Sequence, residues 1–262
     1  MRIAIVTQDA PLYMASFLDD FVKQIKSGQH QIGFLVAYSP LFNHTFIQEL
    51  RQRMQFYGFS AFVKVSLYIA WNKFLSILSG LLSMDGTYSV AQVCQRHQIK
   101  ISAPQSPNAS AFIKLLHDEH IDLLVSVACP KILKETVLNT PRYGCINYHT
   151  GLLPRYRGRQ PMFWAMLNGE SEIGVTIHVM DTVIDNGPIL VQEHIPIEPR
   201  DTLHDLYLKT TKRGSTSLIK AIDLLASGDK SRIQNDAALA TYFSFPTAQD
   251  SAQFRRAGKR FM

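Results

Sequence analysis

The chain has 262 residues, of which 46% are hydrophobic and 18% are charged, and its formal net charge is +6. This length fits one large domain or one domain with an appendage, and the low charge excludes disorder for most of the chain. Three cysteines match neither a zinc pattern nor a disulfide framework, so we expect no metal and a reducing, cytoplasmic location. The N-terminus has one basic residue and a very short apolar run, which predicts a first strand and not a signal peptide.

Predicted strands and helices alternate in the first half of the chain. Apolar runs predict strands at 3–7, 32–38, 99–102 and 121–128. Helical spacing predicts helices at 17–25, ending near Gly28, at 45–57 and at 109–119. This alternation predicts an α/β fold in which helices cover both faces of a mostly parallel sheet.

The second half continues with strands, one loop and a long helix. Strands are predicted at 141–149, entered through a turn at 142–144, and at 174–180 and 189–197, which a turn at 181–187 joins. A loop at 151–158 precedes a short helix at 161–167 with proline in its first turn. Asp201 is the expected cap of a long helix that ends at Gly228, and an irregular tail follows. We therefore divide the chain into a main α/β domain, 1–228, with an apolar insertion at about 59–84, and a basic extension, 229–262.

Residues 59–84 form an apolar segment with two lysines, Lys64 and Lys73. Because these charges and several polar residues interrupt the run, we do not expect a membrane-spanning helix. Three alternatives remain open: a buried helix pair, which we favour, a surface for oligomer formation, and peripheral contact with a membrane.

Excess positive charge lies in a loop and in the tail. The loop residues are Arg155, Arg157 and Arg159, and the tail residues are Arg255, Arg256, Lys259 and Arg260. Arginines beside a helix N-terminus suit an anionic acceptor such as a phosphate, but they are equally well explained as solvated loop charges. The tail is interpreted as a solvated basic segment.

Asn147 and His149 are two positions apart on the predicted strand 141–149, so both side chains point to one face. They lie at its carboxyl end, where open α/β sheets place their sites. Asp185 follows in the turn at 181–187. Together the three offer an oxyanion donor, a general base and a carboxylate that stabilises a charged imidazole. His178 lies within a strand and is expected to support the site structurally.

Residues 147–193 contain an ordered series of short motifs. They are Asn-x-His, Leu-Leu-Pro-x-Tyr-Arg-Gly, Pro-x-x-Trp, Asn-Gly, Gly-Val-Thr-x-His and Asp-x-Gly-x-Ile. This order resembles the 10-formyltetrahydrofolate-dependent formyltransferase family, which includes glycinamide ribonucleotide, methionyl-tRNA and amino-sugar formyltransferases. The resemblance implies the formyltransferase fold, with a Rossmann-like sheet followed here by a C-terminal helix and tail. The chain departs from the family pattern at Gly151, where serine is usual, and at Pro188.

The resemblance also implies roles for single residues. Asn147 would donate a hydrogen bond to the oxyanion, His149 would take the proton of the attacking amine, and Asp185 would hold His149. The pterin of 10-formyltetrahydrofolate would bind mainly to backbone groups of two segments. The implied cofactor-binding residues are Cys129, Pro130, Lys131, Ile132, Leu133, Leu153, Asp181, Thr182, Val183, Ile184 and Asp185. Arg157 and Arg159 are the candidates for binding the acceptor.

The favoured acceptor is a small amine, most simply a nucleotide-linked amino sugar. Only about 60 residues follow Pro199, which leaves no room for the tRNA-binding domain of the methionyl-tRNA enzymes, so tRNA is not expected as a partner. The alternatives are a methionyl-tRNA formyltransferase-like protein, a formyltetrahydrofolate hydrolase, and a folate-binding scaffold without activity.

Overall fold

The computed structural model describes residues 1–262 except 11, 27, 40–45 and 83–87. In this part of the chain the main sheet has six strands in the order β2-β1-β3-β4-β6-β7. The strands are β1 (Arg2–Gln8), β2 (Gln31–Tyr38), β3 (Leu123–Val127), β4 (Cys145–His149), β6 (Glu172–Val179) and β7 (Ile189–Pro196). β1, β2, β3 and β4 are parallel, β6 runs antiparallel to β4, and β7 runs antiparallel to β6 and so in the direction of the first four, which confirms the predicted mostly parallel sheet.

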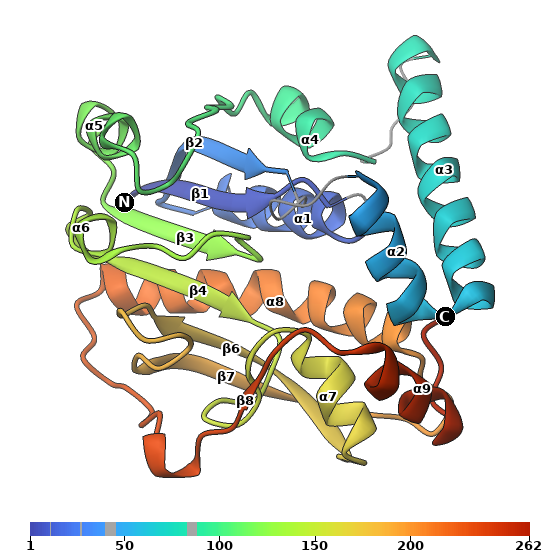
Figure 1. The fold of residues 1–262 in the computed structure, drawn as a ribbon. Coiled ribbons are helices and arrows are strands. Elements are labelled where there is room, and N and C mark those ends of the chain that lie inside the picture. Colours follow the sequence, from blue (N-terminus) through green and yellow to red (C-terminus); the bar gives the residue numbers. More distant parts are fainter. Residues whose placement is uncertain (11, 27, 40–45, 83–87) are drawn as a thin grey trace.

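Alternating side chains of the central strands enter two hydrophobic layers. Ile3 and Ile5 of β1 face the larger layer, and Ala4 and Val6 face the smaller one. The larger layer is covered by α1 (Met14–Lys26), α4 (Val90–His97), α7 (Pro161–Leu167) and α8 (Leu203–Ala226). The smaller layer is covered by α5 (Ser110–Asp118) and α6 (Glu135–Leu138). Figure 1 shows these helices on the two faces of the sheet, as predicted.

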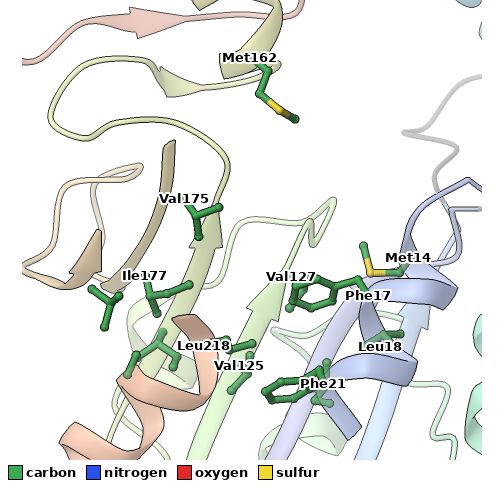
Figure 2. Close-up of a cluster of buried hydrophobic side chains, with 14 of the residues drawn as sticks. Met14, Phe17, Leu18, Phe21, Val125, Val127, Met162, Val175, Ile177 and Leu218 are labelled. Carbon is green, nitrogen blue, oxygen red and sulfur yellow. The ribbon is translucent and has the colours of Figure 1, made fainter. Parts of the chain in front are cut away.

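The larger layer joins elements that are far apart in the sequence. Figure 2 shows Phe17 and Phe21 of α1 directed at β3, where Val125 and Val127 lie, while Leu218 of α8 lies near Ile177 of β6. The apolar face of α1 and the buried side chains of β3 therefore pack together in one hydrophobic core. This core holds the parallel strands in register and so fixes the edge at which they end.

Before β3 one predicted strand is absent from the described residues and one helix is present that the sequence analysis missed. Residues 99–102 do not form a strand: they make a single bridge in which the Leu35 N–H donates to Lys100 and the Leu35 carbonyl accepts from Ser102, both at 2.9 Å. Pro104 follows closely and has no N–H with which to continue the ladder. Helix α4 was not predicted. Its signals are the Ser89 cap and the buried pair Val90 and Val93.

The long helix α8 begins one residue later than predicted. Its cap is Thr202, whose hydroxyl accepts from the Asp205 N–H at 3.2 Å while the Asp205 carboxylate accepts from the Thr202 N–H at 2.8 Å. This reciprocal capping box satisfies two helix-end groups, whereas Asp201 accepts from the Glu198 N–H instead.

The tail is more regular than predicted. It contains a 3₁₀ turn at Ala237–Leu239, the short strand β8 (Tyr242–Phe243) and α9 (Ala248–Arg256). β8 pairs with β5 (Arg157–Gly158), and Phe254 and Phe261 belong to the larger hydrophobic layer. Because these aromatic residues are isolated in a polar stretch, no periodic pattern marks them in the sequence.

The apolar segment forms α3 (Phe59–Leu82), which follows α2 (Phe46–Tyr57) after Gly58. Gly58 takes a left-handed conformation, φ 72°, which turns the chain between the helices. Phe56 packs on Phe163 and Phe261, with ring centroids 5.4 and 5.1 Å away, and so anchors α2. Position 45, the predicted start of α2, and positions 83–84 lie outside the described residues.

The favoured prediction of a buried helix pair is wrong for α3. Phe59 is 77% exposed and Leu67 is 66% exposed, because only one side of the helix contacts the domain. Residues 59–79 are long and apolar enough to cross a membrane by length and composition alone. The expectation that they do not cross one stays a prediction.

Phe254→Ala is expected to lower the free energy of unfolding by about 3–5 kcal/mol, because it empties a fully buried ring site in the core. Urea denaturation measures this loss. Gln253→Ala, on the exposed side of α9, is the control and should change stability by less than about 0.5 kcal/mol. Equal effects of the two variants would contradict a structural role for the tail.

Candidate active site

The register of the sheet brings two of the site residues together. Asn147 on β4 lies directly opposite His178 on β6, and the Asn147 amide nitrogen is 3.3 Å from His178 Nε2. The Nδ1 of His178 is 2.9 Å from the Val179 carbonyl, which only accepts, so Nδ1 carries the hydrogen and Nε2 is free to accept from Asn147. His178 thus orients the Asn147 amide, as the structural role predicted for it requires.

His149 has partners at both ring nitrogens. Its Nε2 lies 2.8 Å from the Tyr156 carbonyl, so this nitrogen donates a hydrogen bond. In the neutral imidazole Nδ1 then carries no hydrogen, and it lies 3.5 Å from Asp185 Oδ2. Nδ1 is therefore the atom of His149 that can take up a proton, and the resulting charge would face a carboxylate.

Asp185 is the centre of the cluster. The Gly158 N–H donates to its Oδ2 at 2.8 Å, and Oδ1 lies 3.4 Å from both the Asn147 amide nitrogen and His178 Nε2. The Asp185 backbone is left-handed, with φ 52°, which is rare for a residue with a side chain. Asp185, which is distant in the chain from Asn147 and His149, thus lies within contact of both.

Burial and charge act in opposite directions on the two titrating groups. Burial lowers the pKa of His149 below its usual value, and the neighbouring Asp185 charge only partly offsets this. For Asp185 burial alone would raise the pKa, but the charge that His149 gains when protonated, the neighbouring His178 ring and the Gly158 N–H hold the pKa well below its usual range. Asp185 is therefore ionised and His149 neutral near pH 7, which is the pairing a general base requires.

Arg157 has an internal role that the sequence did not reveal. Its side chain is buried, and it donates to Asn186 Oδ1 at 2.9 Å and to Asn235 Oδ1 at 3.0 Å. Asn235 in turn donates to the carbonyls of Asp185 and Gly187 at 3.0 and 2.9 Å. Asn235, from the tail, thus braces the turn at 181–187. No motif identified it, because its role depends on where the tail returns.

The other two loop arginines lie on the outer side. Arg155 pairs with Glu170 at 2.8 Å, and Arg159 stacks on the Phe245 ring at 4.7 Å. The proposed contacts of Arg157 and Arg159 with an acceptor stay predictions. Arg159 is the better placed of the two, because its side chain is exposed whereas Arg157 is engaged internally.

The tail also holds the loop that carries the partners of His149 and Asp185. The Tyr156 N–H donates to the Thr241 hydroxyl and the Arg157 N–H to the Thr241 carbonyl, both at 2.9 Å. The Tyr156 carbonyl and the Gly158 N–H are therefore positioned by residues of the segment 229–262. The division of the chain into 1–228 and 229–262 stays a prediction.

Gly151 is required by the position of His149. A Cβ at this position would lie 2.8 Å from His149 Nε2 and 2.9 Å from the Pro161 Cβ. The glycine that replaces the usual serine therefore leaves space for the His149 ring beside the Tyr156 carbonyl.

The two predicted pterin-binding segments are loops. Residues 129–133 follow β3 through the left-handed Ala128, and the Asn108 side chain pins them by donating to the Ile132 carbonyl at 2.8 Å. Residues 181–185 follow β6, and their apolar side chains Val183 and Ile184 are exposed, as is Ile132. Exposed apolar side chains on backbone loops fit a flat ring that binds through main-chain groups.

Two of the predicted cofactor-binding side chains have clear environments: Cys129 in the first segment and Leu153 in the loop at 151–158. Burial raises the pKa of the Cys129 thiol to about 11, so this thiol is protonated near neutral pH and is a poor nucleophile. Leu153 is buried.

The residues of the cluster lie within a segment that is similar to known proteins. The sequence model of the formyl transferase family matches residues 78–222, which is more than half of the chain. The chain belongs to the formyl transferase family. The match includes β4, the turn at 181–187 and both predicted pterin segments, and it leaves out most of α3.

Sequence relatives of this formyl transferase family member include methionyl-tRNA formyltransferases. The protein of that name from Geotalea uraniireducens (strain Rf4) is 37% identical over 153 residues, which are 58% of this chain and 49% of the relative. The chain spans about half the length of the curated relatives it matches. The expectation that tRNA is not a partner is therefore not confirmed.

Solved structures confirm the formyltransferase fold. Glycinamide ribonucleotide transformylase 1 from Symbiobacterium toebii has a TM-score of 0.61 at 16% identity, covering 90% of this chain and 94% of that one. A sugar 3N-formyl transferase solved with dTDP and 5-N-formyl-THF has a TM-score of 0.59 at 19% identity, covering 93% and 69%. At these identities the likeness concerns the fold alone.

Gly151→Ala is expected to destabilise the protein by about 1–3 kcal/mol, because the added carbon must displace His149 or Pro161. Urea denaturation measures the loss. Gly28→Ala is the matched control, since its Cβ would meet only an ordinary contact at 3.6 Å. Equal stability of the two variants would show that the site tolerates the carbon.

His149 is expected to titrate below about 6.5, the ordinary value for histidine, because burial disfavours its charged form. Asp185→Asn should lower this pKa further, since the carboxylate is the charge that raises it. Proton-detected NMR of ¹⁵N-histidine across a pH series measures both values. A rise of the His149 pKa in Asp185→Asn would contradict the assigned electrostatics.

Proposed function

We propose that this chain is an N-formyltransferase that moves the formyl group of 10-formyltetrahydrofolate to the primary amine of a small acceptor. The observation that carries the proposal is the meeting of Asn147, His149 and Asp185 beside the loops at 129–133 and 181–185. Membership of the formyl transferase family supports the same reaction.

The donor supplies an electrophilic formyl carbon, and negative charge grows on the formyl oxygen as an amine attacks. The side-chain amide of Asn147 is the group that donates to this oxygen, because His178 and Asp185 hold its nitrogen without a short hydrogen bond. One such donor contributes roughly 10²–10³ in rate. Because both of its present hydrogen bonds are long, the Asn147 amide can still donate to the formyl oxygen.

His149 takes the proton of the attacking amine at Nδ1. The proton then lies between Nδ1 and Asp185 Oδ2, where the carboxylate stabilises the imidazolium. The imidazolium then gives this proton to N10 of the folate as the bond between N10 and the formyl carbon breaks, so tetrahydrofolate leaves and the formylated amine remains. A positioned general base of this kind contributes roughly 10²–10⁴ in rate. The hydrogen bond from Nε2 to the Tyr156 carbonyl keeps the ring in the tautomer that leaves Nδ1 free to act.

A nucleotide-linked amino sugar is the acceptor we propose. Exposed Arg159, close to the N-terminus of α7, offers a cation for a phosphate group. The second candidate is methionyl-tRNA, which the 37% identity to a methionyl-tRNA formyltransferase favours. A cytoplasmic location agrees with a soluble folate donor and stays a prediction.

Release of tetrahydrofolate from 10-formyltetrahydrofolate tests the proposal when it is measured with a panel of amines. The panel contains nucleotide-linked amino sugars, glycinamide ribotide, simple amines and methionyl-tRNA, and mass spectrometry identifies the formylated product. A formylated amino sugar is the expected result. Release without any amine would favour a hydrolase, and a formylated tRNA would favour the second candidate.

Asn147→Ala and His149→Ala are each expected to lower kcat at least about 100-fold, because each removes one oxyanion donor or the base. His194→Ala is the matched control, since this histidine is exposed on β7 and pairs with Glu172 at 2.8 Å, away from the cluster. Near-normal turnover in His149→Ala would refute the mechanism. Donor binding without turnover in the unmodified chain would indicate a scaffold.

A further inference from the structure

Helix α3 carries an apolar stripe on its exposed side. Successive residues turn by about 100° around a helix, and at this spacing the five side chains of the stripe fall within an arc of about 80°. The stripe consists of Phe59, Val63, Leu67, Phe74 and Ile77, and all five are exposed. An exposed helix face is normally polar, so this arrangement indicates a surface that another body covers.

The two lysines of α3 flank the stripe. Lys64 lies beyond one edge and Lys73 beyond the other, about 180° apart around the helix, and both are exposed. Trp71 lies beside Lys64 and is also exposed. An apolar centre with flanking lysines and an aromatic ring is typical of helices that lie in a membrane interface.

The inner side of α3 is fastened along its length to the rest of the protein. Val65 is buried, and the Tyr68 ring meets the edge of His204 from α8 at 5.7 Å. Further along, the Gln92 amide of α4 donates to the Ser76 carbonyl at 2.8 Å and to the Ser79 hydroxyl at 3.1 Å. A helix held in this way presents one face, which suits lying on a surface better than crossing a bilayer.

We propose that the stripe docks on the surface of an anionic lipid bilayer. Helices α2 and α3 carry four basic residues, Arg51, Arg53, Lys64 and Lys73, against the single acid Glu49. Each cation near an anionic surface raises binding by about fivefold. The guanidinium of Arg255 lies beside Gly58, at the junction of α2 and α3, and adds a further cation there.

A second copy of the chain fits this face less well. Helix α3 contains no Asp or Glu, so two copies packed stripe to stripe would bring four lysines together without a carboxylate of the helix between them. Anionic phosphates supply the missing charge. Figure 1 shows α3 on the side toward which β1, β3 and β4 point, so docking would bring the edge that carries the candidate site toward the lipid.

Sedimentation of the full chain with lipid vesicles tests the proposal without folate or amine, so its outcome is independent of formyl transfer. Vesicles of equal parts phosphatidylcholine and phosphatidylglycerol are compared with vesicles of phosphatidylcholine alone. Binding to the anionic vesicles, weaker binding to the neutral ones and release by high salt are expected. No binding to the anionic vesicles would overturn the proposal.

Variants identify the face. Leu67→Glu should lower the partition coefficient roughly tenfold or more, because it removes an apolar contact and adds a repelled charge. Leu239→Glu is the matched control, since Leu239 is 64% exposed and Leu67 is 66% exposed. Replacing both Lys64 and Lys73 with glutamine should lower binding roughly 25-fold. Circular dichroism checks that each variant is folded.

Three further results would overturn the proposal. Equal binding of Leu67→Glu and the unmodified chain would show that another face binds the vesicles. Binding that survives alkaline carbonate would show insertion across the bilayer. A dimer in light scattering that Leu67→Glu abolishes, without vesicle binding, would show that a second copy covers the stripe.

Discussion

A mostly buried, ionised carboxylate at Asp185 is the constraint on which the candidate site depends. Its side chain is only 10% exposed, and such a charge is costly to bury unless other groups supply hydrogen bonds and opposite charge. The Gly158 N–H and the Asn147 amide supply hydrogen-bond donors, and His149 supplies opposite charge once its Nδ1 takes up a proton. The same contacts that stabilise the carboxylate also orient the base and the oxyanion donor, so stability and chemistry share one arrangement.

This arrangement needs support from the backbone around it. Asp185 and Tyr156 both take left-handed conformations, which cost free energy for residues with side chains and persist only where neighbours hold them. Asn235 holds the carbonyl of Asp185, and Thr241 holds the chain on both sides of Tyr156. The tail thus acts as a clamp on two strained segments, while Phe254 and Phe261 fasten the tail itself to the core.

Apolar side chains serve two different purposes in neighbouring helices. In α2, Phe56 is buried among Phe163 and Phe261 and fixes the helix to the protein. In α3, the stripe that includes Phe59 and Leu67 faces away from the protein. The proposed membrane contact and the proposed formyl transfer rest on separate observations, although Figure 1 shows α3 on the side toward which β1, β3 and β4 point.

The sequence by itself determined the alternating elements, the sheet type and the residues of the cluster. Periods of two and of 3.6 residues are local properties, and the Asn-x-His motif places Asn147 and His149 on one face whatever surrounds them. The order of motifs also identified the family. These features needed no knowledge of where distant segments meet.

Only the tertiary structure decided the rest. The contact of Asn235 with the turn at Asp185 and the internal role of Arg157 depend on where the tail returns. The exposure of α3 could not be predicted either, because an apolar helix fits a core or a surface and the choice depends on its neighbours in space. Local patterns state what a segment prefers, whereas burial and long-range hydrogen bonds depend on the whole chain.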